Sequence, residues 1–151
     1  MSAVKIVLLV LGILSLQALI LIPVILWLRR RSARLTTELR EELAAAGERV
    51  TRGPEAAVYR GATDRYPQVK GNGIIALTDR RLIFRPLMGR HLELSLDQLT
   101  GVREEKWFLR SYNGRMHLIL RMKDGAEVGF MVADHPAWMA ALRAIATSSS
   151  T

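Results

Sequence analysis

The chain has 151 residues, 50% of them hydrophobic, with 22 Lys and Arg against 14 Asp and Glu, and it has no cysteine. The absence of cysteine excludes disulfides, thiolate zinc sites and cysteine nucleophiles, and it agrees with a reducing compartment. Without Lys5 and the arginines at 29–31, 18 basic residues remain against 14 acidic ones. This modest excess argues against nucleic-acid binding, which needs a denser basic patch, and suits weak attraction to an anionic membrane surface.

An uninterrupted apolar segment spans residues 6–28. Its 23 residues would form roughly 35 Å of helix, which is enough to cross a hydrocarbon core of about 30 Å. Gly12 and Pro23 are tolerated in such helices, and Trp27 suits the headgroup level. No small-residue cleavage site precedes the arginines that follow, so the sequence predicts an uncleaved anchor over residues 1–31 and not a secretory signal.

Charge asymmetry predicts the orientation of this anchor. Lys5 is the only charged side chain before the apolar segment, whereas four arginines follow it directly: Arg29, Arg30, Arg31 and Arg34. The positive-inside rule therefore predicts a cell-membrane protein with its N-terminus outside and its C-terminal domain in the cytoplasm. The same arginines are also suited to contact anionic headgroups.

Residues 32–54 are predicted to be a juxtamembrane helix and linker. Leu35, Leu39 and Leu43 form a stripe at helical spacing, Ser32 is a candidate N-cap, and Gly47 is a candidate terminator. We expect this helix to be a spacer; a self-association stripe is the alternative.

From residue 55 to residue 133 the apolar period changes to two, which is typical of strands. The predicted strands are residues 57–60, 73–77, 81–85, 91–96, 101–109, 116–122 and 126–132. Asn113-Gly114 and Asp124-Gly125 are hairpin-turn signals. Tight turns between seven short strands predict an antiparallel meander.

A last helix is predicted to start at Asp134, with Pro136 in its first turn and a buried stripe that includes Trp138. The predicted fold class is an N-terminal transmembrane helix plus a mainly β domain, in which about seven antiparallel strands form an open barrel or sandwich closed by one C-terminal helix. The domain is expected to span residues 55–147, with a disordered tail at 148–151.

The order of these elements resembles the pleckstrin-homology-like (PH-like) superfold. The local sequence of one predicted hairpin resembles it as well: Gly73-Ile74-Ile75-Ala76-Leu77-Thr78-Asp79-Arg80-Arg81-Leu82-Ile83-Phe84. It looks most like the GRAM and bacterial PH-like branches. The resemblance covers residues 55–146, and Trp138 matches the tryptophan of their closing helix.

That resemblance implies a binding module and suggests two classes of partner. Eukaryotic relatives often bind phosphoinositides through basic residues, so an anionic-lipid headgroup is one candidate partner. The corresponding candidates here are Arg60, Lys70, Arg80, Arg81 and Arg85, although a solvated strand face would produce the same pattern. Because the anchor already provides localisation, we favour an unidentified protein partner, bound at an edge strand or in the groove beside the closing helix.

No catalytic, metal or cofactor site is predicted. His91, His117 and His135 are dispersed and expected at the surface, and the adjacent Glu104 and Glu105 should point to opposite faces of a strand. The protein is therefore expected not to be an enzyme.

Trp107 and Phe108 are candidate partner contacts. Neighbouring aromatic residues on a strand cannot both face the core, so one of them should lie at the surface. A contact with a partner protein or with the bilayer interface is one interpretation, and an edge position covered by the loop 110–114 is the other.

Overall fold

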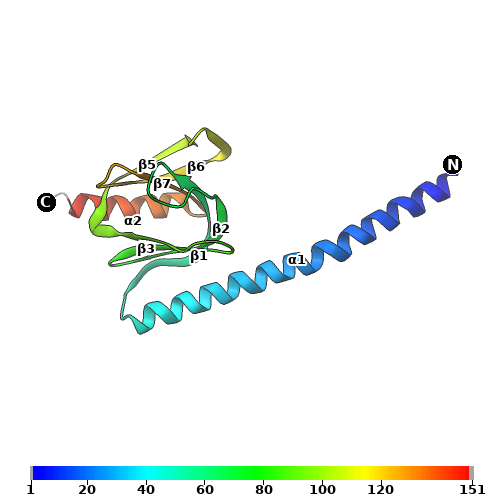
Figure 1. The fold of residues 1–151 in the computed structure, drawn as a ribbon, viewed down its shortest axis with the longest axis horizontal. Helices are drawn as coiled ribbons and strands as arrows, with labels where there is room; N and C mark the ends of the chain where they lie inside the picture. Colours follow the sequence, from blue (N-terminus) through cyan, green and yellow to red (C-terminus); the bar gives the residue numbers. More distant parts are fainter. Residues whose placement is uncertain (1, 150–151) are drawn as a thin grey trace. The chain divides into compact units, whose positions relative to one another are not determined.

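The computed structural model describes residues 2–149. The elements run in the order α1 (Ala3–Ala45), β1 (Val50–Ala62), β2 (Gly71–Thr78), β3 (Arg81–Pro86), β4 (Leu92–Ser95), a short 3-10 helix η1 (Leu96–Gln98), β5 (Leu99–Phe108), β6 (Ser111–Met122), β7 (Glu127–Val132) and α2 (His135–Ser148) (Figure 1). The chain divides into two compact units, one up to Arg34 and one from Leu35 onward, so that α1 begins in the first and ends in the second.

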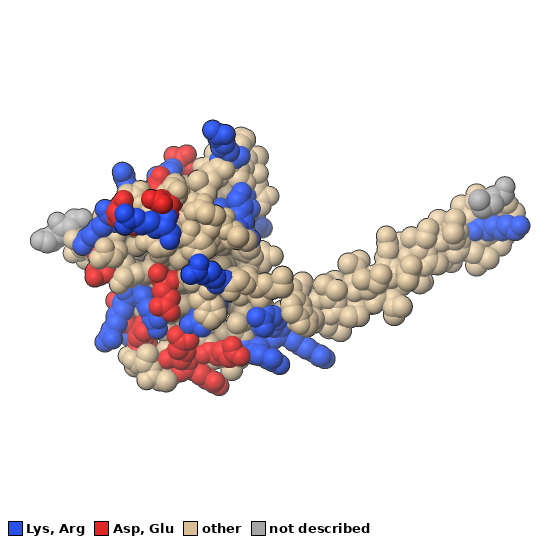
Figure 2. All heavy atoms as spheres, viewed as in Figure 1, with Lys and Arg blue, Asp and Glu red and all other residues tan. Residues whose placement is uncertain are grey.

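The first unit is the apolar part of α1, which is helical throughout, with Pro23 inside it. Its apolar side chains are exposed, and charged groups occur only toward its two ends (Figure 2). By length and composition this helix is able to span a bilayer. Orientation stays a prediction from the flanking arginines.

The second unit is built on one antiparallel sheet with the strand order β4-β3-β2-β1-β7-β6-β5, curled into a half-barrel beside α2 (Figure 1). Its concave face holds the core, where the rings of Tyr59, Phe84 and Phe130 meet with centroids 5.4–5.6 Å apart. Trp138 of α2 is fully buried in the same core. The predicted fold class is confirmed.

The leucine stripe of α1 is part of the domain. Leu35, Leu39 and Leu43 are buried against the outer face of β2 and β3, where the apolar residues are Ile74, Ala76 and Ile83; Leu87, which directly follows β3, packs against the same cluster. The predicted helix start at Ser32 is wrong, because α1 is continuous through that position. The expected spacer is instead a second layer, since β2 is apolar on both faces and needs a cover outside as well as inside.

The predicted reversal at Asn113-Gly114 is also wrong. Phe108 pairs with Ser111, so the chain turns at Leu109 and Arg110, which have φ values of 47° and 60°. Two non-glycine residues in this region cost roughly 1–2 kcal/mol each. The early turn buries Phe108, which contributes about 1.5–3 kcal/mol, and Asn113-Gly114 becomes part of an irregularity in β6.

The capping prediction for α2 is confirmed. The Asp134 side chain accepts a hydrogen bond from the Ala137 amide, and Pro136 lies in the first turn. The helix extends to Ser148, one residue into the segment expected to be a tail, and residues 150–151 lie outside the described part of the chain.

Candidate ligand-binding site at the open end of the half-barrel

Arg81 and Arg85, two of the five candidate headgroup residues, are ion-paired within the domain. From the outer face of β3, Arg81 contacts Glu48 and Glu93, at 2.8 Å in each case. Arg85 contacts Glu42 at 2.6 Å. The Arg81 and Arg85 side chains are only 21% and 12% exposed. These arginines therefore tie β3 to the end of α1 and to β4.

Glu48 is the most enclosed carboxylate of this network, with 7% of its side chain exposed. It accepts hydrogen bonds from Arg81 Nε at 3.0 Å and from the Thr78 hydroxyl at 2.8 Å. The hydrogen bond from Arg81 lowers the pKa of Glu48 in spite of burial. The carboxylate is therefore charged at neutral pH.

Of the other three candidates, Arg60 and Lys70 lie at neighbouring positions where β1 pairs with the start of β2, because Tyr59 pairs with Gly71, whereas Arg80 lies apart from them. Lys70 directly precedes β2 and Arg80 follows its far end, so the 8 residues of β2 separate them by roughly 25 Å. Arg60 lies on β1 and donates to Ser111 Oγ and, at 3.3 Å, to His117 Nε2. The five cations thus form no common headgroup site, and acidic and basic groups are interspersed over the domain (Figure 2).

His117 is fully buried, so the expectation of a surface histidine is wrong. It does point to the outer face of β6, but the end of the β5–β6 hairpin covers it, and its ring lies 6.2 Å from that of Phe108. His117 Nδ1 faces the Glu105 carbonyl at 3.3 Å, while Nε2 accepts from Arg60. Burial lowers the pKa of His117.

The remaining histidines stay near the surface. His91 is exposed, and His135 Nε2 lies 2.6 Å from Glu104. Glu105 instead contacts Arg103 at 2.7 Å, so Glu104 and Glu105 have separate partners.

The adjacent aromatic residues separate as the pattern predicts. Phe108 is buried, whereas Trp107 is 61% exposed and stacks on Tyr112 with ring centroids 5.1 Å apart. The space for the Phe108 ring exists because residue 129 is glycine: a Cβ there would lie 2.4 Å from Phe108 Cε1.

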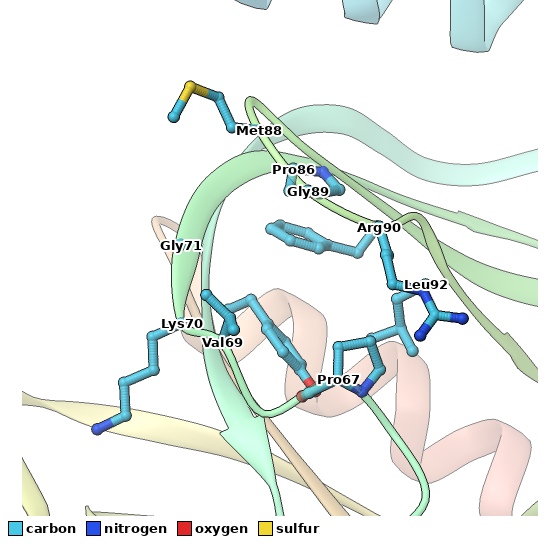
Figure 3. Close-up of a pocket in the computed structure, with 11 residues that line it drawn as sticks. Pro67, Val69, Lys70, Gly71, Pro86, Met88, Gly89, Arg90 and Leu92 are labelled. Atoms are coloured by element: carbon cyan, nitrogen blue, oxygen red, sulfur yellow. The ribbon is translucent and has the colours of Figure 1, made fainter.

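An apolar cavity of about 180 Å³ opens between the β1–β2 and β3–β4 connections (Figure 3). Tyr59 and Phe84 line its core side, and Val69 and Met88 lie on its rim. Its other lining residues are Pro67, Lys70, Gly71, Pro86, Gly89, Arg90 and Leu92. An apolar cavity of this size suits a ring or a branched aliphatic group.

Tyr59 ties the cavity wall together. Its hydroxyl donates to the Pro67 carbonyl in the β1–β2 connection. Burial raises the pKa of Tyr59 to about 12. Tyr59 is therefore a neutral structural donor at physiological pH, and its ring supplies apolar contact surface.

The rim combines apolar and basic groups. Val69 is 83% exposed and Met88 is 75% exposed. Lys70 and Arg90 extend away from the cavity on opposite sides (Figure 3). Within residues 2–149 neither cation has an ion-pair partner. The cavity can therefore take an apolar group that carries negative charge beside it.

A second, wider groove of about 750 Å³ lies beside α2, the position expected for a partner groove. Ala141, Ala144 and Ile145 form its helix side, while Arg80 and Asp97 lie on the sheet side. The two edge strands, β4 and β5, are the other expected surfaces.

The cavity at the open end was not predicted from the sequence. Val69 and Met88 are apolar residues outside the predicted strands, each within two residues of a cation. Large apolar side chains in loops do not belong to the alternating pattern of the core. Their presence there could have indicated a binding surface.

Comparison with known proteins supports the fold alone. No protein-family model and no curated protein matches the sequence. Among solved structures, the chain is similar to the C-terminal domain of an unknown protein from Leishmania infantum, with a TM-score of 0.51 and 13% identity over 70% of this chain and 92% of that one.

Proposed function

We propose that this chain is a membrane-anchored, non-enzymatic binding module whose cavity at the open end of the half-barrel takes an apolar side chain of a protein partner. In this proposal α1 is a single-pass anchor with its N-terminus outside, and the domain lies in the cytoplasm. The arginines from Arg29 to Arg34 support that orientation through the positive-inside rule.

One observation carries the proposal: the two most exposed large apolar side chains of the described domain, Val69 and Met88, both lie on the rim of its apolar cavity. Soluble domains rarely place such groups together outside an interaction site. The unpaired Lys70 and Arg90 favour a partner segment with acidic residues beside its apolar anchor.

A distant relationship to PH-like or GRAM domains is part of this proposal. The half-barrel of seven antiparallel strands with a C-terminal helix supports it, as does the similarity of residues 73–84 to the hairpin of those families. Binding of anionic headgroups by Arg60, Lys70, Arg80, Arg81 and Arg85 has less support. Arg60 and Lys70 are neighbours, but Arg80 lies at the far end of β2, and Arg81 and Arg85 are paired with carboxylates.

The cavity can be filled by a single substitution. Gly71 pairs with Tyr59, so a side chain at position 71 would point to the concave face, and its Cβ would meet nothing within 4 Å. Gly71→Leu should therefore occupy the cavity without a backbone clash. Gly101→Leu is the matched control, since its Cβ is equally free and Gly101 does not line the cavity.

Random dodecapeptides displayed on phage would be selected on the full-length chain in lipid nanodiscs. We expect enrichment of sequences in which Leu, Met or Phe adjoins Asp or Glu. Burying such a side chain contributes about 1.5–3 kcal/mol, so Gly71→Leu should weaken binding by about ten- to a hundredfold, while Gly101→Leu should leave it unchanged. Failure to enrich any peptide, or equal binding to both variants, would overturn the proposal.

A further inference from the structure

The β5–β6 hairpin ends in a turn at the edge of the sheet (Figure 1). Its end carries exposed aromatic and basic side chains that do not line the cavity. We call residues 106–115 the hairpin tip. Trp107 is 61% exposed, Tyr112 is 52% exposed and Leu109 is 39% exposed. The two rings stack 5.1 Å apart at an interplanar angle of 27°, so they form one flat apolar surface.

The hairpin tip is held firmly to the domain. Phe108 is buried over Gly129 and beside His117. Arg60 of β1 donates a hydrogen bond to Ser111 Oγ across the base of the turn. The exposed rings are therefore presented from a fixed base, which lowers the entropy lost when they bind.

All formal charges of the hairpin tip are positive. Lys106, Arg110 and Arg115 are exposed, and residues 106–115 include no Asp or Glu. Within residues 2–149, none of these three cations has an ion-pair partner. In contrast, the arginines of the outer face of β3 are matched by carboxylates.

We propose that the hairpin tip inserts Trp107 and Tyr112 into the headgroup layer of an anionic bilayer. Indole and phenol rings favour this layer because it solvates their apolar bodies and their polar atoms together. A cation near an anionic leaflet contributes about 1 kcal/mol, or about fivefold in the binding equilibrium. A protein partner would have to supply a matching acidic surface, whereas an anionic leaflet supplies one around the whole tip.

This inference uses the membrane anchor but not the cavity. An anchored domain samples the adjacent bilayer at high local concentration, so a weak contact becomes well populated. No residue of the hairpin tip lines the cavity, so filling the cavity with Gly71→Leu should leave the tip contact intact. The two proposals can therefore fail independently.

The absence of cysteine allows a single probe to be placed. Asn113→Cys, labelled with the fluorophore NBD, adds an exposed reporter between Tyr112 and Gly114. The full-length chain would be reconstituted in vesicles of phosphatidylcholine alone or with 30% phosphatidylglycerol. We expect blue-shifted NBD emission and quenching by doxyl lipids in the anionic vesicles, and a smaller effect in the neutral ones.

Two variants and a matched control test the cause. The double variant Trp107→Ala, Tyr112→Ala should abolish the blue shift of the NBD emission. Replacing Lys106, Arg110 and Arg115 by Gln should weaken the binding of the tip to the anionic bilayer by up to about a hundredfold. The control replaces the exposed Arg121, Lys123 and Arg143 by Gln, which removes the same charge elsewhere. Unquenched, water-like NBD emission in anionic vesicles would overturn the proposal, as would equal effects of the two triple variants. Circular dichroism would verify that each variant is folded.

Discussion

Replacing Leu39 by Ala would measure how much the last part of α1 contributes to the domain. Leu39 has no exposed surface and packs on the outer face of β2 and β3. Deleting three buried carbons costs about 0.8 kcal/mol each in transfer free energy, and the remaining cavity adds to this. We expect the free energy of unfolding of the domain to fall by about 2.5–4 kcal/mol.

The measurement is urea unfolding of the full-length chain in mild detergent, followed by near-ultraviolet circular dichroism, which reports the packing of buried Trp138. Arg40→Ala is the control, because Arg40 is the exposed next residue of the same helix and alanine keeps helix propensity. It should change stability by less than about 0.5 kcal/mol. Equal midpoints for the two variants would refute the packed layer and restore the simple spacer.

Three further predictions concern other parts of the chain. Burial lowers the pKa of His117, so on acidification the unfolded state takes up a proton at this histidine before the folded state does. The free energy of unfolding should therefore fall as the pH drops below about 6.5. His117→Gln should reduce this pH dependence, measured by chemical unfolding at pH 7.5 and 5.5. Gly129→Ala should lower the free energy of unfolding by about 1–3 kcal/mol, because its Cβ would clash with the Phe108 ring. In a protein that already carries Phe108→Ala, Gly129→Ala should have almost no further effect on stability. Additive losses from the two substitutions would contradict the clash. In intact cells a membrane-impermeant maleimide should label Ser2→Cys, and it should label Asp97→Cys only after lysis; the reverse pattern would contradict the predicted orientation.

Most of the strands and the final helix could be predicted because their signals are local. The exception is the first part of β1, since residues 50–54 were expected to be linker and are paired with β2 instead. In β7 the alternation of Val128, Phe130 and Val132 predicts the face that packs into the core, and Asp134 marks the start of α2 without reference to any other part of the chain. These elements agree with their local preferences, so the pattern alone was sufficient.

Features that depend on distant partners could not be read in this way. The leucine stripe of α1 indicates a need for an apolar surface but does not identify that surface as β2 and β3. The turn at Leu109 and Arg110 prevails over Asn113-Gly114 because of the space above Gly129, which lies on another strand. The candidate headgroup arginines look solvated in sequence, and only the fold brings Glu42 and Glu48 to Arg81.

The continuation of α1 into the domain has a consequence for proteolysis. Cleavage after Arg34 would release a unit that keeps its leucine layer and its ion pairs, and this fragment should remain folded and soluble. Cleavage after Gly47 would instead leave Ile74, Ala76 and Ile83 uncovered on one sheet face, a surface prone to aggregation. Two cuts only thirteen residues apart in one helix–turn segment would thus give a freely diffusing domain or an insoluble one.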